Sequence, residues 1–327
     1  AQQVRECATA RELRRYGMEL QRSGLTLEDA EAALAQVPRP MSLTRFDALA
    51  VWGQVQARWM VAPVRFGLRA LDTLAGGMFP GDLVVIGGRT SMGKTAFCGS
   101  ATLRWIAADL PTAYYTLETM APGMLLRLIA AKAQIPLHRL RVGTLGPTEF
   151  ELADQTATWL DTRPLSLCDT APLGTKQAGR ILERLTADPA QIVVIDHLQE
   201  VLTDAKAESR ASALGQFMSS LKDVAMRTGK VIVVAAQCNR EAERRADRIP
   251  ALANLKESGG IEERADLVLL LHHWQTAGDT QHPPDELAVY VAKNRDGGTG
   301  KVAVRFQGVY GLVSDPDPRA LPGWITE

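Results

Sequence analysis

Short runs of consecutive apolar residues alternate with longer amphipathic segments from residue 61 onward. Each run has the length of a buried strand, and the segments 122–133, 147–161 and 209–228 carry apolar residues at helical spacing. Continuous apolar strands separated by helices are typical of a parallel sheet covered on both faces. The expected strands are LVVIG at 83–87, TAYYTL at 112–117, PLSLC at 164–168, IVVID at 192–196, VIVVAA at 231–236 and DLVLLL at 266–271.

The pattern changes near the C-terminus, where ELAVYVAKNRDGGTGKVAVRFQG alternates between apolar and polar residues. Two alternating runs flank an Asp-Gly-Gly turn at 296–298, which predicts a β-hairpin. The predicted fold class is therefore α/β, with a mostly parallel sheet flanked by helices and a C-terminal β-hairpin. We expect this domain to span residues 63–327.

The first 62 residues lack strand-like runs and are predicted to be helical. Residues 1–41 contain two amphipathic segments, and Pro38 and Pro40 end the second of them. Residues 42–62 form a third predicted helix, whose apolar stripe either packs on its own domain or docks on a neighbouring subunit. The sequence leaves both interpretations open. The stripe consists of Phe46, Leu49, Trp52, Val55 and Trp59.

Composition narrows the class of protein. The 327 residues include 37 Lys and Arg against 37 Asp and Glu, and 46% are apolar. This apolar content excludes a disordered chain, and the zero net charge excludes a globally basic nucleic-acid coat. No apolar run approaches the ~20 residues of a membrane helix. The four cysteines form no CxxC pair, so free thiols are expected. The chain begins with Ala1, which indicates a piece of a longer protein.

One motif carries specific chemistry, since the segment GRTSMGKT fits G-x-x-x-x-G-K-[ST] between a predicted strand and a helix. In that context the backbone N–H groups wrap a phosphate, Lys94 reaches the outer phosphates and the Thr95 hydroxyl ligates Mg²⁺. An incidental glycine-rich turn is the weaker interpretation. The predicted nucleotide-binding residues are Gly88, Arg89, Thr90, Ser91, Met92, Gly93, Lys94, Thr95 and Ala96.

Three further polar residues end predicted strands, where parallel sheets bind ligands. Asp196 closes IVVID and is the candidate Mg²⁺ carboxylate, although a strand-end cap is the alternative. Glu118 follows TAYYTL and is the candidate base that orients the attacking water, with a helix-capping role as the alternative. Gln237 closes VIVVAA and is the candidate γ-phosphate sensor, although a simple polar strand end also fits.

The motifs together resemble the RecA-like motor domain of the DnaB-type replicative helicases. The segments GGRTSMGKT, TLETM, IVVIDHLQ, VVAAQCNR, LKESGGIEERADLVLLL and VAKNRDGGTGKVAVRF occur in the family's order and cover about three quarters of the chain. The resemblance implies a homohexameric, ATP- and Mg²⁺-dependent ring that moves on single-stranded DNA and unwinds duplex. It also implies primase and a helicase loader as partners, with no membrane association, and a cytoplasmic bacterial, phage or plasmid replisome.

The resemblance adds roles that the residues alone do not indicate. Lys293 and Arg295, otherwise ordinary solvated charges, are expected to reach the γ-phosphate bound by the neighbouring subunit. The stretch after Gln237, otherwise a surface loop, is expected to hold DNA. Its predicted DNA-binding residues are Arg240, Arg244, Arg245, Lys256, Glu257, Ser258, Gly259 and Gly260.

Three positions depart from the family pattern. His197 stands where Tyr is usual, Thr90 where Pro is frequent, and Lys256 where Arg is usual. None of these changes removes a catalytic group. They indicate a divergent member of the family, of phage or mobile-element origin.

Two other functions share parts of this pattern. A RecA- or RadA-like recombinase would share the ATPase core, but the LKESGG and KNR segments argue against it. A non-catalytic helicase loader or adaptor would not need the full set of Lys94, Glu118, Asp196, Lys293 and Arg295. A DNA helicase is therefore the favoured prediction.

Overall fold

The computed structural model divides the chain into two units, Ala1–Met60 and Val61–Glu327. It describes residues 48–49, 52–53, 56, 61–169, 177–201, 210–239, 250–255, 259–274, 277–278 and 281–316. In the first unit the described residues are helical, and the side chains of Leu49 and Trp52 are exposed. The predictions for residues 1–47 lie outside the described residues.

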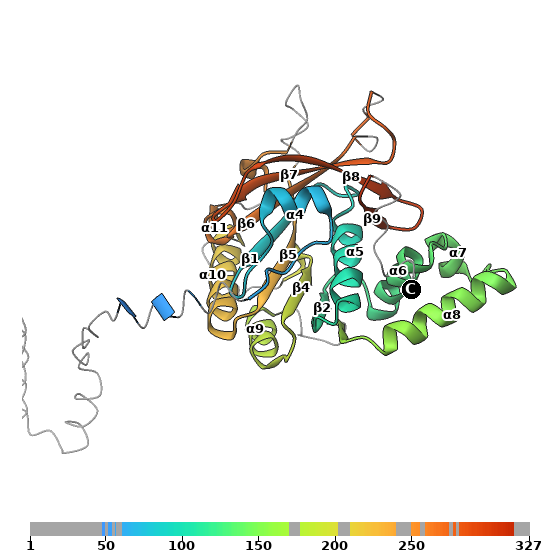
Figure 1. The fold of residues 1–327 in the computed structure, drawn as a ribbon, viewed down its shortest axis with the longest axis horizontal. Coiled ribbons are helices and arrows are strands. Elements are labelled where there is room, and N and C mark those ends of the chain that lie inside the picture. The colour runs from blue at the N-terminus through green and yellow to red at the C-terminus, as the bar shows by residue number, and fades with distance from the viewer. Residues whose placement is uncertain are drawn as a thin grey trace, which may run out of the picture. The chain divides into compact units, whose positions relative to one another are not determined.

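A nine-stranded sheet forms the centre of the second unit, in the order β3-β2-β4-β5-β1-β6-β7-β8-β9 (Figure 1). The strands from β3 to β6 in this order pair in parallel, and β7, β8 and β9 continue the sheet antiparallel. The predicted strands and the terminal hairpin are confirmed. The strands are β1 Leu83–Gly88, β2 Thr112–Thr116, β3 Leu165–Asp169, β4 Ile192–Asp196, β5 Val231–Gln237, β6 Leu267–His273, β7 Glu286–Asn294, β8 Gly300–Gln307 and β9 Leu312–Ser314.

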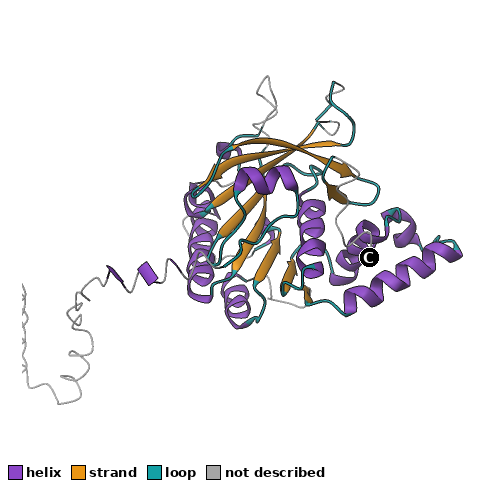
Figure 2. Ribbon diagram, viewed as in Figure 1, coloured by secondary structure: helices purple, strands orange, loops and turns teal. Residues whose placement is uncertain are grey.

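Helices connect the parallel strands and flank the sheet (Figure 2). Prolines in the first turns of α6 and α8 suit positions whose N–H has no partner within the helix. The described α-helices are α4 Arg69–Ala75, α5 Lys94–Ala107, α6 Ala121–Ala133, α7 Leu137–Val142, α8 Pro147–Asp161, α9 Ala178–Ala187, α10 Arg210–Thr228 and α11 Gly259–Arg264; the short 3₁₀ turns are η1 Leu198–Glu200 and η3 Leu252–Asn254.

Alternation along the buried strands creates two apolar cores, one on each face of the sheet. On β1, Val84 and Ile86 belong to the core that includes residues of α5 and α6. Leu83 and Val85 belong to the other core, with residues of α9 and α10. Burying one such aliphatic side chain stabilises the fold by roughly 1.5–3 kcal/mol. The two cores therefore hold the strand ends, and the side chains on them, in fixed positions.

The described part of the chain contains no helix that combines the length and hydropathy needed to cross a bilayer. Three of the four cysteines, Cys98, Cys168 and Cys238, are described and carry free thiols, as expected.

Candidate nucleotide-binding site

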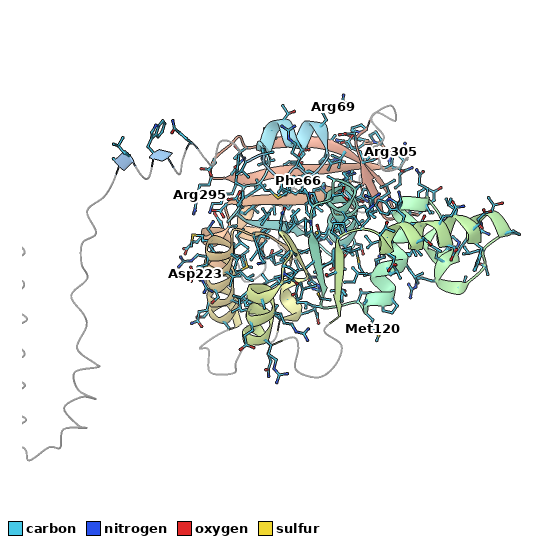
Figure 3. The ribbon with its side chains drawn as sticks, turned by 60° about the horizontal axis from the view of Figure 1, so that its bottom comes forward. Phe66, Arg69, Met120, Asp223, Arg295 and Arg305 are labelled. Atoms are coloured by element: carbon cyan, nitrogen blue, oxygen red, sulfur yellow. The ribbon has the colours of Figure 1, made fainter. Side chains whose placement is uncertain are left out.

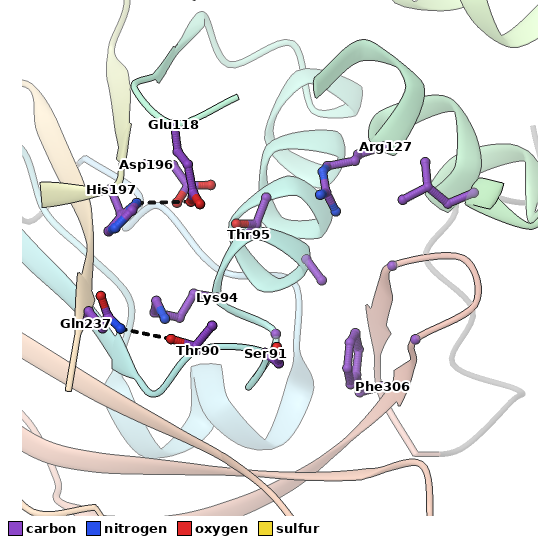
Figure 4. Close-up of a pocket in the computed structure, with 15 residues that line it drawn as sticks. Thr90, Ser91, Lys94, Thr95, Glu118, Arg127, Asp196, His197, Gln237 and Phe306 are labelled. Carbon is purple, nitrogen blue, oxygen red and sulfur yellow. Dashed lines mark hydrogen bonds and ion pairs between the residues drawn. The ribbon is translucent and has the colours of Figure 1, made fainter. Parts of the chain in front are cut away.

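Four neighbouring strands bring the predicted residues Lys94, Glu118, Asp196 and Gln237 to one edge of the sheet. In the strand order, β2, β4, β5 and β1 are adjacent. The pairing sets Thr116 beside Asp196 on one strand pair and Gly88 beside Gln237 on another. Their carboxyl ends surround a cavity of about 390 Å³ (Figure 4). Its lining comprises Thr90, Ser91, Gly93, Lys94, Thr95, Ala96, Glu118, Arg127, Leu137, Asp196, His197, Gln237, Phe306, Gly308 and Gly311.

The phosphate loop connects β1 to α5. Gly93 has φ 85°, a left-handed conformation that glycine adopts without steric strain, and Lys94 begins the 14-residue α5. The Lys94 ammonium donates to the carbonyls of Gly88 and Arg89, both at 2.9 Å. Burial lowers the pKa of Lys94, and the nearby Asp196 and Glu118 oppose that shift. A phosphate at the helix N-terminus would supply the opposite charge that this buried ammonium favours.

Thr95 and Asp196 line the same cavity and fit the requirements of Mg²⁺. The Tyr114 hydroxyl donates to Oδ2 of Asp196 at 2.7 Å, which fixes the carboxylate, and Asp196 is only 7% exposed. Mg²⁺ is usually held by one or two protein oxygens together with water and substrate phosphates. A hydroxyl from Thr95 and a carboxylate from Asp196 are such a donor pair. No group of three or more His, Cys, Asp or Glu side chains arranged for a metal occurs among the described residues.

Glu118 follows β2 and lines the cavity, a position that the proposed role as base requires. Its carboxylate is 66% exposed, and Oε2 lies 3.3 Å from Nδ1 of His197. His197 directly follows Asp196 at the end of β4 and is only 12% exposed. The turn that carries Glu118 is tied to β4, because the Leu117 N–H donates to the Asp196 carbonyl at 2.7 Å. The structure therefore couples the ends of β2 and β4.

Gln237 forms hydrogen bonds to both the phosphate loop and the turn after β4. Its side-chain amide donates to the Thr90 hydroxyl at 2.8 Å, and its backbone N–H donates to Oε1 of Gln199 at 2.9 Å. Gln237 therefore lies beside the phosphate loop, where a sensor of the terminal phosphate is required. The contact with Thr90 is not indicated by the sequence pattern.

The last strands supply a wall of the cavity that sequence reasoning missed. Phe306 of β8 lines the cavity with Gly308 and lies against Gly93 of the phosphate loop. The His273 ring stands edge-on to Phe306 at 5.1 Å, and the His273 backbone N–H lies 3.3 Å from the Met92 sulfur. His273 is the last residue of β6, and its contact with the phosphate loop depends on tertiary packing that no local motif encodes.

Lys293 and Arg295 do not line this cavity. Lys293 pairs with Val268 near the start of β6, whereas Gly88 pairs with Leu271 further along β6. The Arg295 backbone bonds to Asp266, five residues before Leu271, which corresponds to about 17 Å along a strand. Figure 3 shows Arg295 and Arg305 at opposite ends of the hairpin. Lys293 and Arg295 therefore lie toward the amino end of β1, away from the cavity of their own subunit.

The Asp266 carboxylate connects Arg295 to Leu83 and Lys222 through hydrogen bonds. The Asp266 carboxylate is nearly buried and accepts from the Leu83 N–H at 2.8 Å, from the Lys222 ammonium at 2.5 Å and from the Arg295 guanidinium at 2.9 Å. The Lys293 ammonium donates to the Glu262 carbonyl at 2.7 Å. Burial and the adjacent Arg295 lower the pKa of Lys293.

Most predicted DNA-binding residues lie outside the described residues. These are Arg240, Arg244, Arg245, Lys256, Glu257 and Ser258. Gly259 and Gly260 are described and begin α11. Gly260 packs against Gly215 of α10 so closely that an added Cβ would lie 2.4 Å from the Gly215 Cα. Helix packing is thus one reason for glycine at position 260.

The model of the family described as "DnaB-like helicase C terminal domain" matches residues 63–314. This chain belongs to that family. It is 33% identical over 255 residues to the replicative DNA helicase DnaB of Leifsonia xyli subsp. xyli, covering 77% of this chain and 56% of the relative. It is 33% identical over 243 residues to DnaB of Treponema pallidum, covering 74% of this chain and 53% of the relative. The chain thus spans about half the length of these curated relatives.

Solved structures confirm the predicted RecA-like α/β fold of the DnaB-like family. A DnaB-like replicative helicase, described with its interactions with primase, superposes with a TM-score of 0.74 at 23% identity, covering 82% of this chain and 66% of that one. The ATPase domain of G40P gives the same TM-score and identity, covering 82% of this chain and 97% of that one. The RadB recombinase superposes less closely, with a TM-score of 0.50 at 16% identity, covering 78% of this chain and 100% of that one.

Proposed function

We propose that this chain is the motor part of an ATP-dependent replicative DNA helicase, a hexameric ring that moves on single-stranded DNA and unwinds duplex. The observation that carries the proposal is the meeting of Lys94, Glu118, Asp196 and Gln237 around one cavity at the carboxyl edge of the sheet. This is the set of groups that phosphoryl transfer to water requires: a phosphate cradle, a metal carboxylate, a base and a sensor.

The chemistry follows from these positions. The loop N–H groups and Lys94 bind the β- and γ-phosphates of ATP, and Glu118 orients a water in line with the γ-phosphate and accepts its proton. Bound Mg²⁺, held by Thr95 and Asp196, would neutralise charge on the phosphates. Gln237 leaves the Thr90 hydroxyl to bond the γ-phosphate and returns when the phosphate departs.

The site needs a second subunit to be complete. Lys293 and Arg295 lie far from the cavity of their own chain, yet Arg295 is 53% exposed and held by Asp266. A rigid, exposed guanidinium at the far edge of the sheet suits delivery to the nucleotide of a neighbouring subunit in a ring. Exposed Leu49 and Trp52 on the predicted helix of residues 42–62 support docking of that segment on the same neighbour. Hydrolysis would then depend on ring closure.

DNA binding is assigned to the segment that follows Gln237. Residues 239–260 contain five Arg and Lys against four Asp and Glu, a net charge of only +1. Six copies converging on a central channel would multiply this charge and give sequence-independent, salt-sensitive binding. Because the segment directly continues β5, a movement of Gln237 on hydrolysis would be passed to it.

The remaining partners are proposed from the structural relatives and from the family resemblance. One structural relative is described with its interactions with primase. We propose primase and a helicase loader as partners of this protein, ATP and Mg²⁺ as its cofactors, and a cytoplasmic replisome as its location.

Duplex unwinding tests the proposal directly. The chain is expected to hydrolyse ATP faster with single-stranded DNA and to separate a forked duplex. Strand exchange without unwinding would favour the recombinase. DNA-independent nucleotide binding without turnover would favour the adaptor.

A further inference from the structure

We propose that His197 is the positioning residue that holds the Glu118 carboxylate in its catalytic orientation, through a hydrogen bond from Nδ1 to Oε2. The proposal deepens the ATPase function above and rests on it. His197 is not part of the phosphate loop, and the family pattern usually has Tyr at this position. Its role is inferred from its contact, its burial and the turn that carries it.

Glu118 needs a partner to be held in place. The base must be aligned with one water molecule, and a displacement of about 1 Å can lower the rate of a positioned reaction by ~10²-fold. Yet the Glu118 carboxylate is 66% exposed and lies beyond the end of β2, which stops at Thr116. Nδ1 of His197 lies 3.3 Å from Oε2 of Glu118 (Figure 4), a separation that can shorten when substrate binds.

His197 itself is well anchored. Its side chain is 12% exposed, and it lies between Asp196 at the end of β4 and Leu198, which is fully buried in the core shared with α9 and α10. The next residue, Gln199, holds the backbone of Gln237. Consecutive residues of this turn thus have different proposed roles. Asp196 binds the metal and His197 orients the base, whereas Leu198 anchors the turn and Gln199 positions the sensor Gln237.

The contacting atom gives the proposal a sharp test. Nδ1 is bonded to Cγ of the imidazole, as the side-chain amide nitrogen of asparagine is bonded to its Cγ. Asparagine at position 197 can therefore place an N–H near the position of Nδ1. Glutamine carries its amide nitrogen one carbon further out, near the position of Nε2. Phenylalanine keeps the ring volume but has no N–H to donate.

The experiment compares His197→Asn, His197→Gln and His197→Phe with the unaltered chain, under saturating single-stranded DNA. We measure kcat and KM for ATP, and separately the affinity for a fluorescent ATP analogue. For His197→Phe we expect kcat to fall by about 10–100-fold, with analogue affinity changed less than about twofold. We expect His197→Asn to recover most of the lost kcat and His197→Gln to recover little.

Equal losses of kcat in the Asn, Gln and Phe variants, with nucleotide affinity retained, would overturn the hydrogen-bond role. A large loss of analogue affinity in all three would also overturn it, because the residue would then act on binding. Glu118→Gln separates this proposal from the proposed function. If Glu118→Gln keeps full turnover, the base assignment fails; if it is inactive and His197→Phe is not, only the His197 proposal fails.

Discussion

The two ends of the parallel strands differ in how their functional groups are used. At the carboxyl end, Lys94, Glu118, Asp196 and Gln237 come from adjacent strands and line one cavity. At the amino end, the Lys293 ammonium donates to the backbone carbonyls of Glu262 and Glu263, and the Arg295 guanidinium donates to Asp266. We propose that the first end binds and cleaves nucleotide, whereas the charged groups of the second end lie away from this cavity.

We propose that the fold separates the two halves of one catalytic site. The loops at the carboxyl end can accommodate phosphates because backbone N–H groups and a helix terminus are available there. The amino end is held by the Asp266 network, which fixes the guanidinium of Arg295 at the surface. A ring in which each amino end meets the carboxyl end of the next subunit would join the halves.

Arg295→Ala is expected to have the largest effect. Loss of the trans guanidinium should lower DNA-stimulated ATP hydrolysis by about 10³–10⁵-fold, because this charge acts on the transition state of the neighbouring site. Steady-state kinetics measure the loss, and an unchanged affinity for a fluorescent ATP analogue is the control. Normal turnover by Arg295→Ala would show that the two ends act independently.

Glu118→Gln is expected to lower kcat by about 10²–10⁴-fold, because the amide cannot accept the proton of water. Nucleotide binding should persist, since Lys94 and the loop remain. A rapid-quench measurement of phosphate release gives the rate, and equilibrium binding of the ATP analogue gives the control. If the variant binds nucleotide no better than background, Glu118 has a structural role in the cavity.

Asp266→Ala is expected to lower the free energy of unfolding by about 3 kcal/mol, because it leaves a buried Lys222 ammonium without its partner. The matched control is Asp285→Ala, which breaks the exposed ion pair with Arg305 and should change stability by less than about 1 kcal/mol. Urea unfolding of both variants measures the difference. If both variants lower the free energy of unfolding by equal, small amounts, the bonds around Asp266 do not hold Arg295 in place.

Thr90→Val is expected to have a small effect, raising ATP affinity about two- to tenfold. In the proposed mechanism the Thr90 hydroxyl, which accepts from the Gln237 amide, competes with the γ-phosphate for that amide, and one hydrogen bond contributes about 0.5–1.5 kcal/mol. Thr90→Ser keeps the hydroxyl and should bind ATP as the unaltered chain does. A lower affinity in Thr90→Val alone would mean that this contact prepares the site.

Much of the carboxyl-end site could be predicted because its residues sit in local patterns. The Gly-rich loop between a strand and a helix specifies Lys94 and Thr95, and apolar strands ending in a polar residue indicate Asp196 and Gln237. Contacts set by tertiary packing could not be predicted. Neither the approach of His197 to Glu118 nor that of Phe306 to Gly93 follows from sequence spacing, because each joins segments that only the sheet order brings together.

The roles proposed for Lys293 and Arg295 rest on the resemblance alone. Lys293 and Arg295 follow an ordinary alternating strand, so no local pattern distinguishes them from solvated charges. Asp266 was noted only as the start of a strand, although it contacts Leu83, Lys222 and Arg295 in the folded chain.

Mixing two inactive variants tests the shared site most directly. The Lys94→Ala variant should not hydrolyse ATP because it cannot bind the phosphates. The Arg295→Ala variant should not hydrolyse ATP because it cannot supply a guanidinium to the nucleotide of its neighbour. In mixed rings, an Arg295→Ala subunit keeps Lys94 and can be completed by Arg295 from a Lys94→Ala neighbour. Because each side of an interface has the required variant with a probability of about one half, about a quarter of interfaces in an equal mixture would be intact. We expect ATPase activity well above the sum of the separate variants. A mixture no more active than that sum would contradict a site built from the two ends of neighbouring subunits.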